Sequence, residues 1–414
     1  MWDTISDSSH LVNRELFPCV SFLHTPTMSR KSSLPTLSLP RRCWVEIDHA
    51  AMKHNLNVIR KLAGRAYIMA VVKANGYGHG LNEVATTLSK GVAIFAVASL
   101  GEALQLRQTE KTKPILLLSA ALPAEYAEIA RHGFIPTLSS LEEAELFAEA
   151  AFKVRTKNFP LPQIHFTIDT GMGRLGAQPS EAYGIVRAIT KLPLSIHSIS
   201  THLPSADSNR AFTKEQLKRF ESLIAELRPL IPKVPVHVLN SAATILHPAN
   251  ARDLVRIGLL LYGVSPVPKT QRLLKPVLSW KAAVTFIHQI PKGQGISYGS
   301  SFIAPRTLKV AVLPAGYADG YPRQLSGKGA AVLINGKRCP VLGRVTMDQI
   351  IVDISKAGLV KVGNEAVLVG KQLGKKITAT EVATQSDTIP WHLFCGITAR
   401  VTYVHQGLGK EVES

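Results

Sequence analysis

The sequence predicts an α/β protein that consists of a (β/α)8 barrel followed by a mostly β domain. Short β-branched runs alternate with amphipathic helical stretches over about 200 residues, the size of such a barrel. Strand-like runs separated by Gly/Pro turns dominate after about Lys275. A doubly wound sheet is the alternative for the first part. We expect a poorly ordered extension at 1–42, the barrel at 43–276 and the β-rich domain at 277–414.

The first predicted strand is WVEID, which ends at Asp48 and could join the C-terminal domain, and a helix follows through His54–Leu62. The eight barrel strands are expected at Tyr67–Lys73, Ile94–Ser99, Pro114–Ser119, Phe134–Leu138, Gln163–Asp169, Leu194–His202, Val236–Asn240 and Leu254–Gly258. Helical patterns such as GEALQLRQ and KEQLKRFESLIAEL lie between them. The β domain is predicted from runs such as WKAAVTFIHQI, DQIIVDI and EAVLVG.

The composition is that of a protein with a sizeable core, since 46% of the 414 residues are hydrophobic and 19% are charged. The most apolar stretches are much shorter than the roughly 18–20 residues that cross a bilayer, so we expect no membrane partner. Four widely separated cysteines without a CxxC pair indicate no disulfide framework and no metal site, and are typical of a cytoplasmic protein.

The formal net charge is +19, of which residues 1–42 contribute only +2 because they carry five basic and three acidic side chains. No long run of like charges occurs, and no basic stretch is interleaved with stacking aromatics. We therefore expect no nucleic-acid partner and interpret the excess as a solvated surface that suits anionic ligands.

Residues 1–42 are rich in Ser, Thr and Pro and lack the basic and apolar regions of a secretory signal. An organelle transit peptide would be poor in acidic residues, which fits residues from Met28 onward but not those before it. We interpret the segment as a disordered tail or an upstream start, with Met28 as the alternative start.

Lys73 ends the first barrel strand in AVVKANGYGHG, where the reactive groups of a barrel lie. A lysine that closes an apolar strand points into a low-dielectric pocket, which favours the nucleophilic amine that a Schiff-base lysine needs. A snorkelling or ion-paired lysine is the alternative. The loop lacks the Walker pattern of a nucleotide-binding site.

The run AVVKANGYGHG closely resembles the pyridoxal-phosphate (PLP) lysine signature of the alanine racemase family. The resemblance continues in order through DTGMGRLG, STHLPSAD, LNSAA, VRIGLLLYG, ISYGSSF, GYADGYPR and GRVTMDQ, and it spans about Cys43 to Val404. It implies a PLP-binding barrel followed by a β domain and no metal. It also implies an isomerase that interconverts L-alanine and D-alanine for peptidoglycan synthesis.

The resemblance implies a cofactor-binding set in the barrel. The residues are Lys73, Tyr77, His202, Ser241, Arg256, Gly258 and Leu259. Ser241, Gly258 and Leu259, with help from Tyr77, correspond to phosphate contacts, and their place after strands seven and eight agrees with where barrels bind phosphate. Arg256 corresponds to the arginine that faces the pyridine nitrogen; because it keeps its proton, it can only donate a hydrogen bond to that nitrogen.

Racemisation removes a proton from one face of Cα and returns it on the other, which two opposed bases achieve directly. The resemblance assigns these roles to Lys73 and to Tyr298 of a partner subunit, and so implies a homodimer with composite active sites. Arg174 and the partner's Met347 correspond to the substrate-carboxylate contacts. Tyr317, Arg344 and Asp348 correspond to residues of the entrance or its surroundings.

Three positions depart from the family pattern. Thr167 stands where many relatives have a lysine, often carbamylated, that helps to orient the arginine. Ala399 stands where some have a phosphate-contacting tyrosine, and Thr346 where a cysteine is common. None of these is a proton-transfer residue, but they affect carboxylate and phosphate binding.

Two other functions compete with this interpretation. A related PLP racemase of broader specificity would act on serine or basic amino acids. A PLP carrier without catalysis would have a single barrel, which the segment from Ile296 to Gln349 argues against.

Overall fold

The structure is a computed structural model and describes residues 40–154, 160–408 and 412–413. Residues 41–414 form one compact unit. The predicted extension 1–42 lies almost entirely outside the described residues.

Eight parallel strands of the described chain form the barrel, which confirms the predicted fold class. They are β2 (Tyr67–Val71), β3 (Ile94–Val97), β4 (Ile115–Leu117), β5 (Thr137–Leu138), β6 (Gln163–Thr167), β7 (Ser195–Ser200), β8 (Val236–His237) and β9 (Leu254–Ile257). The sheet order is β4-β3-β2-β9-β8-β7-β6-β5. A parallel bridge between Leu116 and Ile135 joins β4 to the chain that leads into β5, as a barrel rather than a doubly wound sheet requires.

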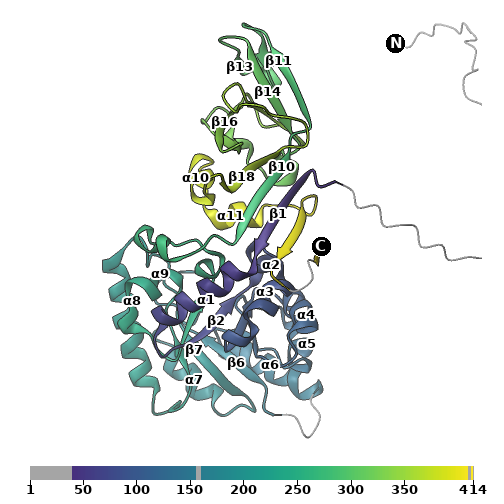
Figure 1. The fold of residues 1–414 in the computed structure, drawn as a ribbon. Helices are drawn as coiled ribbons and strands as arrows, with labels where there is room; N and C mark the ends of the chain where they lie inside the picture. The colour runs from purple at the N-terminus through teal and green to yellow at the C-terminus, as the bar shows by residue number, and fades with distance from the viewer. Residues whose placement is uncertain (1–39, 155–159, 409–411, 414) are drawn as a thin grey trace, which may run out of the picture. The chain divides into compact units, whose positions relative to one another are not determined.

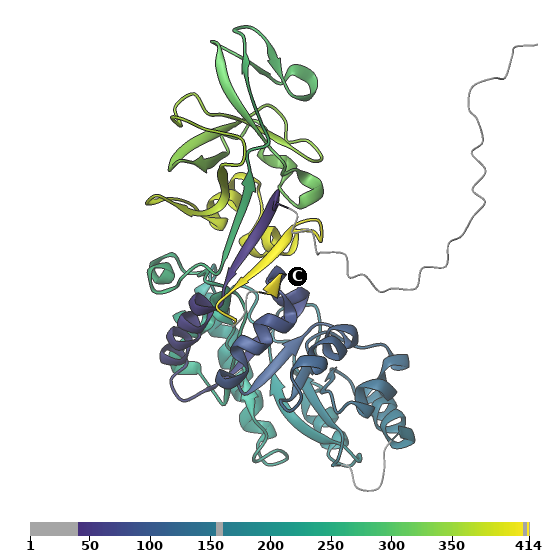
Figure 2. The same ribbon diagram turned by 45° about the vertical axis from the view of Figure 1, so that its right-hand side comes forward.

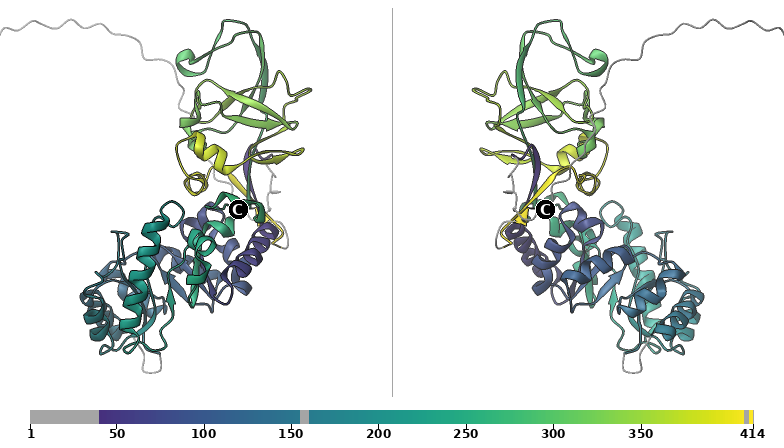
Figure 3. Two further views of the ribbon diagram at one scale, coloured as in Figure 1. Left: turned by 90° about the vertical axis from the view of Figure 1, so that its left-hand side faces the viewer. Right: turned by 90° about the vertical axis from the view of Figure 1, so that its right-hand side faces the viewer.

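Helices alternate with these strands and lie outside them (Figures 1 and 3). They are α1 (His49–Ala63), α2 (Lys73–Gly78), α3 (Leu81–Leu88), α4 (Leu100–Thr109), α5 (Tyr126–Arg131), α6 (Leu141–Val154), α7 (Ala182–Ile189), α8 (Arg210–Leu227) and α9 (Ser241–Leu246). The helix predicted from His54 begins at His49, because the Asp48 side chain accepts a hydrogen bond from the N–H of Ala51 and caps it.

The second domain is built on a mixed sheet. Its main strands are β10 (Leu278–Ala283), β11 (Phe286–Ile290), β14 (Leu308–Leu313), β15 (Ala331–Ile334), β16 (Lys337–Leu342), β17 (Ile350–Asp353), β18 (Glu365–Gln372), β19 (Lys375–Ile377), β20 (Thr402–Gln406) and β21 (Val412–Glu413). β12 (Gly295–Ile296) and β13 (Phe302–Ile303) form a separate hairpin. Two helices, α10 (Ala379–Gln385) and α11 (Pro390–Cys395), complete the domain.

The first strand of the described chain, β1 (Cys43–Asp48), belongs to this second sheet. It pairs antiparallel with β10 and parallel with β20, as Figure 2 shows for the purple strand between its green and yellow neighbours. Trp280 of β10 is fully buried and packs edge-on against Tyr321.

Helix α11 of the second domain packs against the loop that follows β2. A Cβ atom on Gly78, whose φ is +74°, would lie 2.2 Å from the carbonyl oxygen of Phe394. The Phe394 ring also packs edge-on against His79, with 5.0 Å between ring centroids. This contact fixes the loop of Lys73 between the barrel and the second domain.

Candidate active site

A cavity of about 570 Å³ opens at the carboxyl ends of the barrel strands. Eight predicted site residues line it: Lys73, Tyr77, Arg174, His202, Ser241, Arg256, Gly258 and Leu259. They come from five strands or the loops behind them, which is how barrels assemble their sites.

Lys73 lies half-buried in the cavity wall, directly after Val72 at the end of β2. The next four residues, 74–77, form a left-handed turn with φ between 52° and 61°. This conformation costs roughly 1–2 kcal/mol for each residue with a side chain, so surrounding contacts must hold it. Among them, Glu102 accepts from the N–H of Ala74 at 2.7 Å and the Asn75 side chain accepts from the N–H of Leu81 at 2.8 Å.

Tyr77 is held so that its hydroxyl lies beside the Gly258 backbone. Its ring stacks on Tyr262 at 4.8 Å, and a Cβ on Gly258 would lie 2.6 Å from the Tyr77 oxygen. Burial raises the pKa of Tyr77 to about 12, so the hydroxyl keeps its proton and can donate a hydrogen bond. The Ser241 hydroxyl accepts from the N–H of Gly258 at 3.2 Å, which gathers all three groups in one corner.

Arg256 is buried and fully engaged through its two terminal nitrogens. Nη1 donates to Nδ1 and the carbonyl of His237 at 2.6 and 3.0 Å, and Nη2 donates to the carbonyls of Thr201 and Val238 at 2.6 and 3.1 Å. Among the described residues no carboxylate pairs with it. Burial lowers the pKa of Arg256 to about 10, so it remains a cation at neutral pH in the wall of the cavity.

His237 belongs to a buried polar network beneath Arg256. Because its Nδ1 accepts from the guanidinium, its Nε2 carries the proton, which faces the Ser198 hydroxyl at 3.3 Å. The His237 ring stacks on His165 at 4.9 Å, and His165 is bonded to the hydroxyls of Ser198 and Ser200. Burial and the charge of Arg256 hold the pKa of His237 well below its ordinary value, so this support stays neutral.

His202 and Arg174 face the same space. Burial, and then the charges of Arg256, Arg174 and Lys73, lower the pKa of His202 to about 3, so it is a neutral imidazole. The loop that carries Arg174 is organised by Asp169, whose carboxylate accepts from the backbone N–H groups of residues 171, 172 and 173 at 2.6–2.8 Å.

The other five predicted site residues lie in the second domain and do not line this cavity. They are Tyr298, Tyr317, Arg344, Met347 and Asp348. Their loops are joined, since the N–H of Tyr317 donates to Thr346 at 3.1 Å and the Ser297 hydroxyl donates to the carbonyl of Arg344 at 2.7 Å. Tyr298 is 71% exposed and Met347 is 51% exposed, so both are accessible from outside their own chain.

Two of the positions that depart from the family pattern, Thr167 and Ala399, have different surroundings. Thr167 is buried in the cavity wall, whereas Ala399 is exposed and does not line the cavity. Trp391, on α11, does line it and was not predicted as a site residue, nor was His237. Both residues come close to the site through tertiary packing. For His237 the sequence did hold a signal, because the HVLNS run that contains it leads directly into the LNSAA motif.

In the part of the chain that the structure describes, no group of three or more His, Cys, Asp or Glu side chains is arranged to hold a metal ion. None of the helices in those residues is both long and apolar enough to span a membrane.

Three buried histidines should make folding sensitive to acid. Burial is the main cause that lowers the pKa values of His49 and His165 to about 3 and of His79 to about 4. Below an ordinary histidine pKa of about 6.5 the unfolded chain takes up protons that the folded chain does not, so stability falls as the pH falls. Each histidine contributes up to about 1.4 kcal/mol per pH unit. We expect urea unfolding to give a lower free energy of unfolding at pH 5.5 than at pH 7; an unchanged or higher value would contradict this.

Two family models match the chain. The model of the alanine racemase N-terminal domain matches residues 47–266, and that of the alanine racemase C-terminal domain matches residues 277–405. The chain belongs to the alanine racemase family. This confirms the resemblance seen in the sequence, and the protein is therefore an enzyme of the isomerase class.

Relatives in the alanine racemase family cover most of the chain. It is 40% identical over 370 residues to the alanine racemase of Halothermothrix orenii and 41% identical over 372 residues to that of Nostoc sp.. Each alignment covers 88% of this chain and 96% of the relative.

Solved structures of the family have the same fold. The alanine racemase of Clostridium difficile matches with a TM-score of 0.83 and 33% identity, over 91% of this chain and 99% of that one. That of Bacillus anthracis with bound L-Ala-P matches with a TM-score of 0.79 and 33% identity, over 90% and 97%.

Proposed function

We propose that the protein is a PLP-dependent racemase that interconverts L-alanine and D-alanine with Lys73 and Tyr298 as its two bases. The observation that carries this proposal is the cavity itself. It combines an accessible lysine amine with a buried arginine that has no carboxylate partner among the described residues and with a corner of phosphate-type donors. Membership of the family supports it.

The residues fit PLP in their chemistry. The Tyr77 and Ser241 hydroxyls and the Gly258 backbone are suited to hold the phosphate. Arg256 uses both terminal nitrogens on protein acceptors, which leaves Nε as its donor for the pyridine nitrogen. Lys73 supplies the amine that would hold the aldehyde carbon. When bound, PLP would withdraw electrons from the amino acid and make its Cα proton acidic.

The chain's own residues then handle the carboxylate and the proton. Arg174 binds the substrate carboxylate, and the N–H of the partner's Met347 binds it from the other side. Lys73 Nζ removes or returns the Cα proton on one face, and Oη of the partner's Tyr298 does so on the other. His202 is neutral, so it offers a hydrogen-bonding group in the cavity without adding another permanent charge to that of Arg256.

This proposal requires a homodimer with two composite sites. The homodimer is supported by the positions of Tyr298 and Met347, which are exposed and lie apart from the cavity of their own chain. We also propose that the enzyme acts in the cytoplasm and that its D-alanine supplies peptidoglycan synthesis.

The test is chiral chromatography of L-alanine incubated with the PLP-loaded protein, with L-serine and L-lysine in parallel. We expect D-alanine to form far faster than D-serine or D-lysine. D-serine or D-lysine as the main product would change the substrate but keep the mechanism, and no D-product from PLP-loaded protein would refute the proposal.

A further inference from the structure

The turn that carries Met347 presents two backbone donors to the outside. Within it, Thr346 and Gln349 bond to each other through backbone and side chain, at 2.7–3.2 Å. Across the described residues, no hydrogen bond takes up the N–H of Met347 or of Asp348, and both residues are exposed. These N–H groups are therefore available to an acceptor from outside the chain.

The nearest obstacle to such an acceptor is in the turn itself. Asp348 carries a carboxylate next to the free N–H of Met347. Short acidic side chains readily accept hydrogen bonds from nearby backbone N–H groups. A freely rotating Asp348 would compete for the donors and repel an incoming carboxylate.

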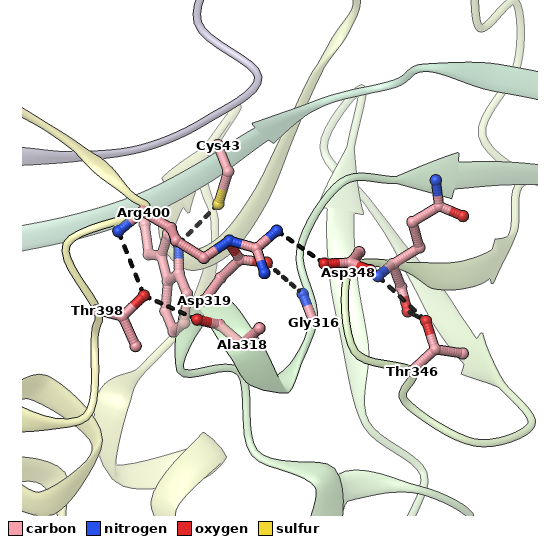
Figure 4. A network of polar contacts seen from close by, with 10 residues as sticks. Cys43, Gly316, Ala318, Asp319, Thr346, Asp348, Thr398 and Arg400 are labelled. Atoms are coloured by element: carbon pink, nitrogen blue, oxygen red, sulfur yellow. Dashed lines mark hydrogen bonds and ion pairs between the residues drawn. The ribbon is translucent and has the colours of Figure 1, made fainter.

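Arg400 binds that carboxylate, as Figure 4 shows. Nη2 of Arg400 donates to Oδ1 of Asp348 at 2.7 Å, and Nε lies 3.3 Å from Oδ1 of Asp319. Among the ion pairs of the described residues, neither carboxylate has another basic partner. A guanidinium can serve both carboxylates at once because its donors point in fixed, separate directions.

The other end of this contact is anchored. Asp319 is buried, and its Oδ2 accepts from the N–H of Gly316 at 2.9 Å. The Thr398 hydroxyl donates to the carbonyl of Ala318 at 2.8 Å, and the N–H of Arg400 donates to that hydroxyl at 3.4 Å. Arg400 thus reaches from a fixed loop to the exposed turn.

A second contact ties the two loops together directly. The N–H of Ala318 donates to the carbonyl of Met347 at 3.0 Å. A Cβ on Gly316 would lie 2.2 Å from that same oxygen, so the approach is as close as glycine allows. The backbone of the turn is therefore fixed, and the direction of the Asp348 side chain is what Arg400 decides.

We propose that Arg400 is a positioning residue for substrate-carboxylate recognition. It holds the Asp348 carboxylate aside and offsets its charge, so that the N–H of Met347 stays open to the carboxylate of an amino acid in the partner's cavity. This inference rests on the proposed function, in which Met347 serves the partner's site.

The test is a double-mutant cycle with Arg400→Met and Asp348→Asn. Arg400→Met should raise the KM for alanine about 10-fold, with a smaller change in kcat, because it frees a carboxylate beside the carboxylate-binding donor. The inhibition constant of propionate, which is alanine without its amino group, should rise in parallel. In the Asp348→Asn background the same change should alter both constants less than about three-fold, since no charge is freed.

Arg306→Met is the matched control. Arg306 pairs with Asp353 at 3.3 Å and is about as exposed as Arg400, at 51% and 50%. Its loss should leave KM and the propionate constant unchanged. Arg400→Lys keeps the charge but only one directed contact, so its KM and propionate constant should lie between those of the wild type and Arg400→Met. It also replaces Arg400→Met in the test if that variant folds poorly.

Two results would overturn the inference: an active wild type whose Arg400→Met variant keeps the wild-type KM and propionate constant, or an increase in both that persists undiminished with Asp348→Asn. A wild-type protein that does not racemise alanine would refute the proposed function instead.

Discussion

Lys73→Ala should abolish racemisation, with kcat lowered at least about 10³-fold, because in the proposed mechanism it removes both the amine that holds the cofactor and one of the two proton-transfer groups. The purified protein should also lose the absorbance near about 420 nm that is expected of PLP joined to a lysine. Absorption spectra and chiral chromatography of the same sample measure the two effects.

Lys53 offers a matched control on α1, away from the cavity lining. Lys53→Ala should keep both the absorbance and the activity. If Lys73→Ala retained the absorbance band, the cofactor lysine would be another residue, and the assignment of the left-handed turn after β2 as its setting would fail.

Tyr298→Phe should lower kcat about 10²–10⁴-fold in both directions, because in the proposed mechanism one of the two faces of Cα loses its proton donor and acceptor. The cofactor absorbance should be retained, since the groups proposed to hold PLP, which are Lys73, Tyr77, Ser241 and Arg256, all come from the barrel. Initial rates from L-alanine and from D-alanine, together with the spectrum, separate a catalytic loss from a loss of cofactor.

Tyr67→Phe is the control for that change, since Tyr67 is 69% exposed at the start of β2, at the opposite end of the strand from Lys73. It should behave like the wild type. A Tyr298→Phe variant with the activity of the wild type would remove Tyr298 from the mechanism, and one that lost PLP would make it a cofactor contact.

The barrel could be predicted from the sequence because its strands and helices alternate with local, readable periods. The same pattern located the carboxyl end of β2 closely, although the strand ends at Val71 and a left-handed turn begins at Ala74, directly after Lys73. Asn75 and Gly76 tolerate the left-handed conformation, so the ANGYG run could have predicted this turn.

Features that depend on distant contacts could not be read in this way. β1 pairs with β10 and β20, which are more than 200 residues away, and no local pattern selects those partners. The position of Trp391 in the cavity wall and the bond between Arg400 and Asp348 arise in the same manner. The family resemblance named Tyr298 and Met347, but the sequence alone did not predict that they lie apart from the cavity of their own chain.

The most direct test of composite active sites is a heterodimer of the Lys73→Ala and Tyr298→Phe chains, co-expressed with two tags and purified through both. In the proposed dimer, one of its two sites contains both substitutions, and the other contains the native Lys73 of one chain with the native Tyr298 of the other. We predict about half the wild-type activity for this heterodimer, from two nearly inactive parents. A heterodimer as inactive as its parents would show that Lys73 and Tyr298 of the same chain act together and would contradict the shared site.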